Sequence, residues 1–536
     1  MGKENELLDV IAIGAGVAGI YQIKRLSDHG FNAVLLEANE DLGGTWFKNR
    51  YPGCRFDSES YSYGYSFSRE LVNEWHWKER FSAQLENLKY LNYVADKFKL
   101  RQHIRFNAQV QSMIWEETEH LWRVRLADGE ELTARFIVTC LGVLSIPFTP
   151  EIEGAEAFQG RSFHTFDWPA EPLDLTDKRV GVIGTGATGI QIIAEIADKV
   201  GDLTVFQRHP NWSIPLNNAA IDRDEMDEIR SRYDEILAIC EESQGGFVHL
   251  PDRRGFDAVT KEERKALWDE LYDRHGFALL LANFPETFLE ADANQALSNY
   301  VADRIRARVR DPEIAEKLIP KDHGFGMKRL PLETNYFEAY NRDNVRLIDI
   351  SETPIQQITD RGVMAKGEHH ELDVLVYATG FHTITGALNR IDIQGAQGLL
   401  LRDKWQHETS TYLGLLTHGF PNMLMVAGPQ SVSGSTNYPR TIETGVDWVT
   451  NLLLRLRQSG QTRFEAPLQA ERDWVETVTR AQERMPFSKV RSWFTGYAPD
   501  ADAGAKRYNA FWGGGPKYRA YLRQVEEDEY RSLDIR

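Results

Sequence analysis

Apolar runs and amphipathic stretches alternate near the amino-terminal end of the chain. Residues 8–13 form an apolar run with the length of a buried strand. From residue 17 to residue 26, apolar positions recur at the spacing of one helix face, and Gly30 is a typical stop signal. A second apolar run follows at 33–36. The order strand, helix, strand predicts a βαβ unit with a parallel sheet.

The turn between this first strand and helix is rich in glycine. Gly14, Gly16 and Gly19 form the pattern G-x-G-x-x-G. In that pattern the first glycine permits a tight turn, the second lets backbone N–H groups approach a pyrophosphate at the helix N-terminus, and the third allows close packing of helix on strand. Glu37 directly follows the second apolar run, where an acid accepts hydrogen bonds from ribose hydroxyls. The segment therefore predicts a dinucleotide site.

A second copy of this pattern lies further along the chain. The apolar run 178–183 precedes Gly184, Gly186 and Gly189, and the next apolar run ends on Arg208 instead of an acid. A cation there would pair with a 2′-phosphate and predicts NADP(H), although an exposed strand-end arginine is the alternative. Two sites of opposite charge preference imply two different dinucleotides. We expect FAD at the first and NADPH at the second, because electrons must pass between them.

Two more apolar runs, 135–138 and 373–377, indicate that the chain returns between two nucleotide-binding units. We expect an α/β fold with two Rossmann-type dinucleotide-binding domains, the second inserted into the first. The charged, helically periodic stretch between them predicts a helical insertion. The expected parts are an FAD-binding domain in two pieces (1–145 and 376–536), an NADPH-binding domain (146–375) and the helical insertion within it (about 219–320).

Composition narrows the classes of function. The 536 residues carry a net charge of −18, which argues against nucleic acid as a partner, because phosphate binding needs surplus Lys and Arg. Cys54, Cys140 and Cys240 form no C-x-x-C pair, so we expect no disulfide framework and a cytoplasmic protein. No apolar run has the length of a membrane span. His369-His370 lacks a third ligand nearby, and we expect no metal.

A twelve-residue stretch between the two glycine-rich turns carries a family signature. Residues 158–169 read FQGRSFHTFDWP and match F-x-G-x-x-x-H-T-x-x-W-P. In this stretch the chain resembles the type I Baeyer–Villiger monooxygenases, an FAD- and NADPH-dependent class of flavoproteins. Related N- and S-oxidising flavin monooxygenases usually lack the Thr and the Trp-Pro. The resemblance extends to residues 43–46, 49–53, 328–329, 419–422 and 492–496.

The resemblance implies a definite reaction. NADPH reduces FAD, the reduced flavin captures O₂ as a C4a-peroxyflavin, and the peroxide attacks a ketone to give an ester or lactone. Sulfides would also be oxidised, and an N- or S-oxidising monooxygenase is the alternative function. The expected partners are therefore a small-molecule ketone and O₂. The identity of the ketone and the oligomeric state cannot be predicted from the sequence.

The resemblance also assigns residues. Arg329 matches the catalytic arginine and Asp57 its acidic partner, and a fixed cation is what an anionic peroxide needs in a water-poor site. A surface arginine and a turn-forming aspartate are the respective alternatives. Lys328 would share the NADP phosphate with Arg208. The expected cofactor-binding residues are Gly14, Gly16, Gly19, Glu37, Gly44, Thr45, Trp46, Asp57, Tyr63, Val110, Gly184, Thr185, Gly186, Thr188, Gly189, Gln191, Arg208, Lys328, Arg329, Tyr438 and Trp493.

Two residues, Lys48 and His382, depart from the family pattern, and His164 has two possible roles. Lys48 replaces an aromatic residue of the family pattern, and we expect altered packing beside the flavin. His382 stands where the family usually has Asp, which would affect a contact at a hinge between domains. His164, within the signature stretch, is interpreted as a structural residue that links domains, with a general base as the alternative.

Overall fold

Two sheets, each built around a glycine-rich turn, organise the chain. The computed structural model describes residues 7–432, 436–496 and 508–536. The first sheet has eight strands, in the order β17-β4-β5-β6-β1-β2-β3 with β18 also paired to β6. The central strand β1 pairs in parallel on both sides and is apolar except for Asp9, and its last four residues are buried, as is typical of a strand covered on both faces. The strands are β1 (Leu8–Ile13), β2 (Ala33–Leu36), β3 (Ile104–Arg105), β4 (Val110–Glu116), β5 (Leu121–Leu126), β6 (Glu131–Thr139), β17 (Asp392–Gln394) and β18 (Met423–Met425).

The second sheet has five strands in the order β12-β9-β8-β16-β7, all paired in parallel. The expected domain boundary between residues 375 and 376 falls inside β16, whose four residues pair with both β7 and β8. A boundary after Tyr377 therefore suits this sheet better, and the rest of the nested division stays a prediction. The strands are β7 (Arg161–His164), β8 (Arg179–Ile183), β9 (Asp202–Gln207), β12 (Val345–Asp349) and β16 (Val374–Tyr377).

Three smaller strand groups flank these sheets. An antiparallel group packs beside the second sheet, and two short pairs join distant segments. The antiparallel group consists of β13 (Gln357–Thr359), β14 (Gly362–Ala365) and β15 (Glu368–Glu371), and the short pairs are β10 (Ile214–Pro215) with β11 (Leu332–Glu333) and β19 (Phe464–Glu465) with β20 (Asp534–Ile535).

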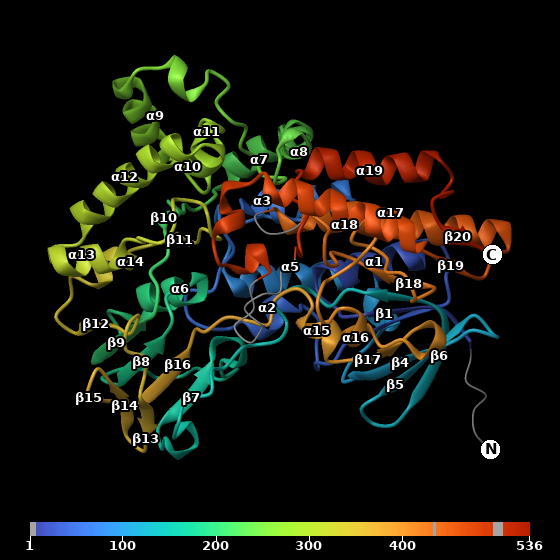
Figure 1. Cartoon of the computed structure of the whole chain (residues 1–536), viewed down its shortest axis with the longest axis horizontal. Helices are drawn as coiled ribbons and strands as arrows, with labels where there is room; N and C mark the ends of the chain where they lie inside the picture. Colours follow the sequence, from blue (N-terminus) through green and yellow to red (C-terminus); the bar gives the residue numbers. More distant parts are fainter. Residues whose placement is uncertain (1–6, 433–435, 497–507) are drawn as a thin grey trace.

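Helices cover the two sheets in separate groups (Figure 1). In that view α9 to α13 lie above the second sheet, and α17, α18 and α19 lie above the first. The helices near the first sheet are α1 (Val17–Asp28), α2 (Thr45–Lys48), α3 (Ser60–Tyr63), α4 (Arg69–Glu74), α5 (Gln84–Lys97), α15 (Gly386–Asn389), α16 (Leu401–Lys404), α17 (Tyr438–Ser459), α18 (Leu468–Glu483) and α19 (Gly515–Glu527).

The remaining helices belong to the second sheet and its insertion. They are α6 (Ala187–Ile196), α7 (Arg223–Ser231), α8 (Tyr233–Glu242), α9 (Lys261–Asp273), α10 (Ala278–Leu281), α11 (Glu286–Leu289), α12 (Ala291–Arg308), α13 (Pro312–Leu318) and α14 (Tyr336–Ala339). The predicted fold class, α/β with two Rossmann-type units and a helical insertion, is confirmed. Within the described ranges no helix combines the length and apolarity needed to cross a membrane.

Two connecting segments join the sheets and run antiparallel beside each other. One leads from β6 to β7, and the other returns from β16 to α15. The backbone N–H of Phe148 donates to the carbonyl oxygen of Gly380 at 2.9 Å, and that of His382 donates to Ile146 at 2.9 Å. The His382 ring also lies 5.4 Å from the Phe148 ring, centroid to centroid. The two passages therefore form a two-stranded ribbon that includes His382, and the effect of this residue on a hinge stays a prediction.

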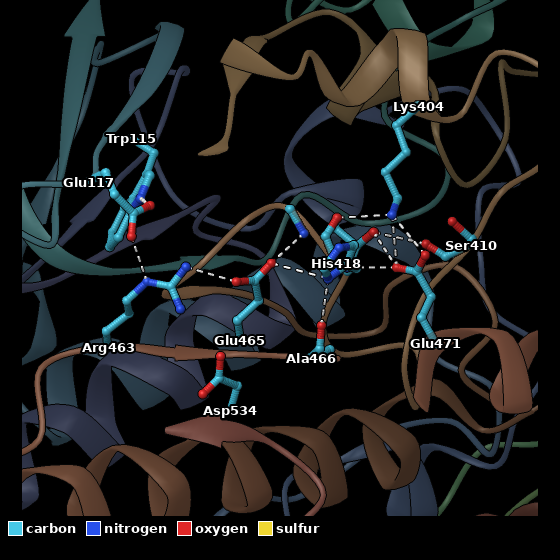
Figure 2. Close-up of polar contacts among 12 residues, drawn as sticks. Trp115, Glu117, Lys404, Ser410, His418, Arg463, Glu465, Ala466, Glu471 and Asp534 are labelled. Atoms are coloured by element: carbon cyan, nitrogen blue, oxygen red, sulfur yellow. Dashed lines mark hydrogen bonds and ion pairs between the residues drawn. The ribbon is translucent and has the colours of Figure 1, made fainter. Parts of the chain in front are cut away.

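A charged network anchors the C-terminal part of the chain to the first sheet (Figure 2). Lys404 Nζ lies 2.7 Å from Glu471 Oε1, and Glu471 Oε2 also accepts the backbone N–H of His418 at 2.6 Å. The His418 ring lies 3.2 Å from Glu465 Oε1, and Glu465 in turn pairs with Arg463 at 2.8 Å. The Glu471 and Arg463 side chains are 3% and 7% exposed. Each buried charge in the network thus has an opposite charge beside it.

Candidate active site

The first glycine-rich turn leaves no room for a side chain at two of its three glycines. Gly14 has a φ of +100°, and a Cβ atom there would lie 2.7 Å from the carbonyl oxygen of Cys140. A Cβ atom on Gly19 would lie 1.9 Å from the carbonyl oxygen of Gly14, so α1 packs directly on the turn. Gly16 is the N-cap of α1, and no side chain in the described part of the chain caps this helix. Its first N–H groups are therefore available to phosphate oxygens.

Glu37 fixes this turn from the end of β2. Its side chain is buried, and Oε2 accepts the backbone N–H of Ala15 at 2.7 Å. The other oxygen, Oε1, accepts the backbone N–H of Asn39 at 2.9 Å. The anchored carboxylate suits a ribose with free hydroxyls and repels a 2′-phosphate.

A cavity of about 530 Å³ opens beside the turn. Its walls come from the turn, from the ends of β2 and β6, from α2, and from the residues that follow β18. Eleven of the residues expected to bind cofactor or to act in catalysis line it, namely Gly14, Gly16, Glu37, Gly44, Thr45, Trp46, Asp57, Tyr63, Val110, Arg329 and Tyr438.

Two glycines face each other in the cavity wall. Gly44 has a φ of +53°, and a Cβ atom on it would lie 2.9 Å from the Cα atom of Gly16. A side chain at Gly44 would therefore occupy the narrow passage between the two backbones. The close approach, together with the uncapped N-terminus of α1, fits the diphosphate of a dinucleotide.

Aromatic side chains form another wall of the cavity. The Phe56 and Tyr63 rings stack with their centroids 4.0 Å apart, and Trp46 Nε1 donates to the Tyr63 hydroxyl at 3.2 Å. The buried hydroxyl of Tyr438 has no hydrogen-bond partner among the described residues. Burial raises the pKa of both Tyr63 and Tyr438, so these phenols stay protonated at neutral pH. The Tyr438 hydroxyl is therefore available to a group bound in the cavity.

Arg329 and Asp57 meet at this cavity from distant parts of the sequence. Arg329 Nη2 donates to Asp57 Oδ1 at 2.8 Å, and Nη1 donates to the carbonyl oxygen of Leu330 at 2.7 Å. The guanidinium carbon lies 5.1 Å from the centroid of the Phe277 ring, a favourable cation–π position. The Arg329 and Asp57 side chains are 25% and 19% exposed. These contacts fix a permanent positive charge in a partly buried position.

The backbone around Arg329 is held by the inserted unit. Asn211 Nδ2 donates to the carbonyl oxygen of Arg329 at 3.0 Å, and Ser213 Oγ donates to that of Pro331 at 2.9 Å. The next residues form β11, which pairs with β10. Asp57, in contrast, lies between α2 and α3 beside the first sheet. The Arg329–Asp57 pair therefore joins the two nucleotide-binding units.

The second glycine-rich turn repeats the geometry of the first. Gly184 has a φ of +108°, and a Cβ atom on Gly189 would lie 2.2 Å from the Gly184 carbonyl oxygen. Gly186 is the N-cap of α6, again without a side-chain cap in the described chain. Thr185 Oγ1 donates to the carbonyl oxygen of His209 at 2.9 Å, which ties the turn to the end of β9. This turn offers a second set of N–H groups for phosphate.

Positive charge gathers at the end of β9. Arg208 is exposed, and its side chain has no hydrogen bond or ion pair with another residue that the structure describes. Lys328 Nζ lies 3.0 Å from Asp322 Oδ2. Desolvation lowers the pKa of His209 and the positive charge of Arg208 lowers it further, while the nearby carboxylate of Asp322 opposes the shift. This electrostatic setting favours a 2′-phosphate, as the sequence predicts.

Helix α6 also contacts the first unit directly. Gln191 Oε1 accepts the Tyr51 hydroxyl at 2.7 Å, and Gln191 Nε2 donates to the carbonyl oxygen of Arg55 at 2.9 Å. Both ends of this amide are thus engaged by the segment that leads to Asp57. Thr188 lies half-buried in the first turn of α6. Contacts of Gln191 and Thr188 with a cofactor stay predictions.

Trp493 is not among the residues that line the cavity. It begins a 3₁₀ helix, Trp493–Thr495, and its ring centroid lies 4.6 Å from that of Phe494. Both rings pack in a cluster that includes Met327, two residues before Arg329. The structure thus places Trp493 near the arginine segment, and its contact with NADP⁺ stays a prediction.

Lys48 connects the first unit to the signature stretch, and His164 lies within that stretch. Lys48 Nζ lies 3.0 Å from Asp167 Oδ1 and 5.0 Å from the centroid of the Phe166 ring. His164 Nδ1 accepts the backbone N–H of Phe166 at 3.1 Å, and its ring packs against Phe381. Lys48 therefore replaces aromatic packing with an ion pair between units. The contacts of His164 support a structural role.

Sequence reasoning missed several residues at the site. Phe277, which lies under the Arg329 guanidinium, comes from the helical insertion, and Arg390 and the segment 141–146 line the cavity. No local pattern marks these positions, because each reaches the cavity only through tertiary packing. Across the described ranges, no cluster of three or more His, Cys, Asp or Glu residues could hold a metal ion.

Comparison with known proteins identifies the family. The flavin-binding monooxygenase-like family matches residues 8–223. The 2-oxo-Delta(3)-4,5,5-trimethylcyclopentenylacetyl-CoA monooxygenase of Pseudomonas putida is 42% identical over 98% of both chains, and the cyclohexanone 1,2-monooxygenase of Acinetobacter is 36% identical over 98% of this chain and 96% of that one. The crystal structure of OTEMO with FAD and NADP matches all of both chains with a TM-score of 0.95 at 41% identity. The chain therefore belongs to the flavin-binding monooxygenase-like family and, within it, to the type I Baeyer–Villiger monooxygenases.

Proposed function

We propose that this chain is an FAD- and NADPH-dependent monooxygenase that converts a ketone to an ester or lactone. The reaction consumes one ketone, one O₂, one NADPH and one proton, and it yields the ester, water and NADP⁺. When bound, the flavin takes electrons from NADPH, activates O₂ and delivers one oxygen atom beside the carbonyl carbon. The observation that carries the proposal is the Arg329–Asp57 pair at the wall of the cavity beside the first glycine-rich turn.

The first glycine-rich turn and its cavity would hold FAD. The N–H groups at the start of α1 would bind the diphosphate, and Glu37 would accept hydrogen bonds from the ribose. The aromatic wall formed by Trp46, Phe56 and Tyr63 would exclude water from the isoalloxazine. The hydroxyl of Tyr438, which has no partner among the described residues, would hydrogen-bond a group in the same cavity.

The second glycine-rich turn would hold NADPH. The N–H groups at the start of α6 would bind its diphosphate, and Arg208 and Lys328 would bind the 2′-phosphate. Because Lys328 and Arg329 are adjacent, the segment that binds the phosphate also carries the cation at the FAD cavity. Binding of the nucleotide would thus help to hold Arg329 in place.

Arg329 would stabilise negative charge on oxygen during attack on the ketone. A guanidinium has five N–H donors, and the contacts with Asp57 and Leu330 leave others for a reacting oxygen. The apolar walls of the cavity lower the local dielectric, so the fixed charge acts more strongly than in water. Asp57 orients the guanidinium and keeps it at the cavity wall.

Replacement of Arg329 by alanine tests this function. Arg329→Ala should bind FAD and accept electrons from NADPH, but ester formation should fall by about 100-fold or more, the usual cost of losing a preorganised charge stabiliser. The matched control is Arg402→Ala, which removes a half-exposed arginine paired with Asp392. Ester formation by Arg329→Ala at the wild-type rate would refute the proposal. Products from matched ketones and sulfides distinguish it from an N- or S-oxidising monooxygenase.

The state of the cysteines supports a proposal for the compartment. Cys54, Cys140 and Cys240 are all free and buried. Unpaired thiols are typical of a reducing environment, so we propose that the enzyme acts in the cytoplasm. The ketone would be a small molecule that reaches the cavity beside Arg329.

A further inference from the structure

A second carboxylate on the Asp57 segment is buried against the helical insertion. Glu59 Oε1 lies 2.8 Å from His249 Nε2, and the two side chains are 4% and 7% exposed. Glu59 Oε2 has no hydrogen-bond partner among the described residues. Because only Ser58 separates Asp57 from Glu59, one short stretch of the first unit contacts the inserted unit twice. The proposed conversion of a ketone to an ester uses only the Asp57 contact.

Stability alone explains this buried pair poorly. Removing a carboxylate from water is costly, and an apolar pair of similar volume often stabilises a fold as well as an ion pair does. The cost is greater here because one oxygen of Glu59 lacks a partner in the described structure. A role in placing neighbouring groups is the alternative, and the surrounding contacts show which groups those are.

The contacts lead from Glu59 to Arg329. Gly276 lies against Glu59, since a Cβ atom on it would be 2.9 Å from Glu59 Oε1. The next residue is Phe277, whose ring lies under the Arg329 guanidinium at 5.1 Å. Thus the carboxylate touches the turn that presents this ring to the cation.

The histidine reaches the same ring from the other side. Phe247, two residues before His249, packs edge-on against Phe277 with the centroids 5.2 Å apart. Both phenylalanines are 2% exposed, so they have little freedom to move independently. Together with the 2.8 Å hydrogen bond between Arg329 and Asp57, these contacts form a closed circuit. The circuit begins at Glu59 and ends at Asp57, on the same short segment.

We propose that His249 is a positioning residue for Arg329 that acts through Glu59 and Phe277. The inference rests on the proposed function, because it assigns His249 to the placement of the cation that this function needs. The Asp57 contact sets the distance of the guanidinium from the first unit. The Glu59–His249 contact fixes the position of the Phe277 ring beneath the guanidinium. His249 itself touches no reacting atom.

The test compares two substitutions in the FAD-loaded enzyme. His249→Leu removes the partner of Glu59, whereas His249→Gln keeps an N–H donor near the position of Nε2. We expect flavin reduction by NADPH to be unchanged in both. In His249→Leu the ester formed per NADPH should fall about tenfold with a matching rise in hydrogen peroxide, within the ~100-fold that a misplacement of about 1 Å can cost. His249→Gln should restore most of the ester yield.

Lys404→Met is the matched control, because it removes the side-chain partner of another buried carboxylate, Glu471. It should lower the melting temperature as His249→Leu does, but the ester yield per NADPH should stay unchanged. The proposal is overturned if Lys404→Met and His249→Leu lose ester yield equally. It is also overturned if the ester yield of His249→Gln is as low as that of His249→Leu.

Crystal structures of the variants separate this inference from the proposed function. A wild-type enzyme that makes no ester from any ketone would refute the function alone. The inference would then be decided by the position of Arg329 in His249→Leu. A guanidinium displaced from Phe277 supports it, and an unmoved guanidinium overturns it.

Discussion

Replacing Arg208 by alanine should weaken the binding of NADPH and leave that of NADH unchanged. Arg208 is exposed at the end of β9 and has no protein partner within the described residues, so a phosphate would gain its full interaction. A hydrogen bond to a charged group contributes about 1.5–3 kcal/mol, which corresponds to about 10- to 150-fold in Kd. Lys328 should contribute less, because Asp322 already neutralises part of its charge at 3.0 Å.

The assay is anaerobic stopped-flow reduction of the bound flavin over a range of NADPH and NADH concentrations. For Arg208→Ala the concentration of NADPH at half-maximal rate should rise by about 10- to 150-fold, while the limiting rate stays unchanged. The rise should shrink at high salt, since ions screen exposed charges. Arg402→Ala should behave as wild type. An equal loss for NADPH and NADH, or no loss for either, would show that Arg208 does not bind the 2′-phosphate.

Two further substitutions test the packing around the site. Gly19→Ala places a Cβ atom 1.9 Å from a carbonyl oxygen of the first turn, so it should cost about 1–3 kcal/mol and lower the FAD content, measured by flavin absorbance per protein. Gly445→Ala, with only contacts of 3.8 Å, should keep its flavin; equal loss in both would contradict the packing argument. Lys404→Met should destabilise the protein by about 3 kcal/mol in urea unfolding, because it strands buried Glu471. Half-exposed Arg402→Ala should cost under about 1 kcal/mol, and an equal effect of both would refute the reasoning.

The features that sequence predicts well are those in which local pattern and structure coincide. Both glycine-rich turns lie at the expected residues, because positive φ at Gly14 and Gly184 and the close approach at Gly19 are requirements of the turn itself. The strand after the first helix and the acid at Glu37 follow the same local logic.

The features that sequence predicts poorly depend on packing between units. The pairing of Arg329 with Asp57 was predicted from the resemblance to a family, because no local sequence pattern indicates it. No sequence pattern indicates Phe277 or His249. They come close to the site only because the helical insertion packs on the segment 57–59. The exact limit near residue 375 has a related cause, since only strand pairing shows that all four residues of β16 belong to the second sheet, and the domain division itself stays a prediction.

The ribbon between the two sheets limits how they could move. Because the outgoing and returning passages are hydrogen-bonded to each other, as between Phe148 and Gly380, neither can rotate about its own bonds without breaking the pairing. Twisting is thereby opposed, and flexion across the ribbon is the motion that costs least.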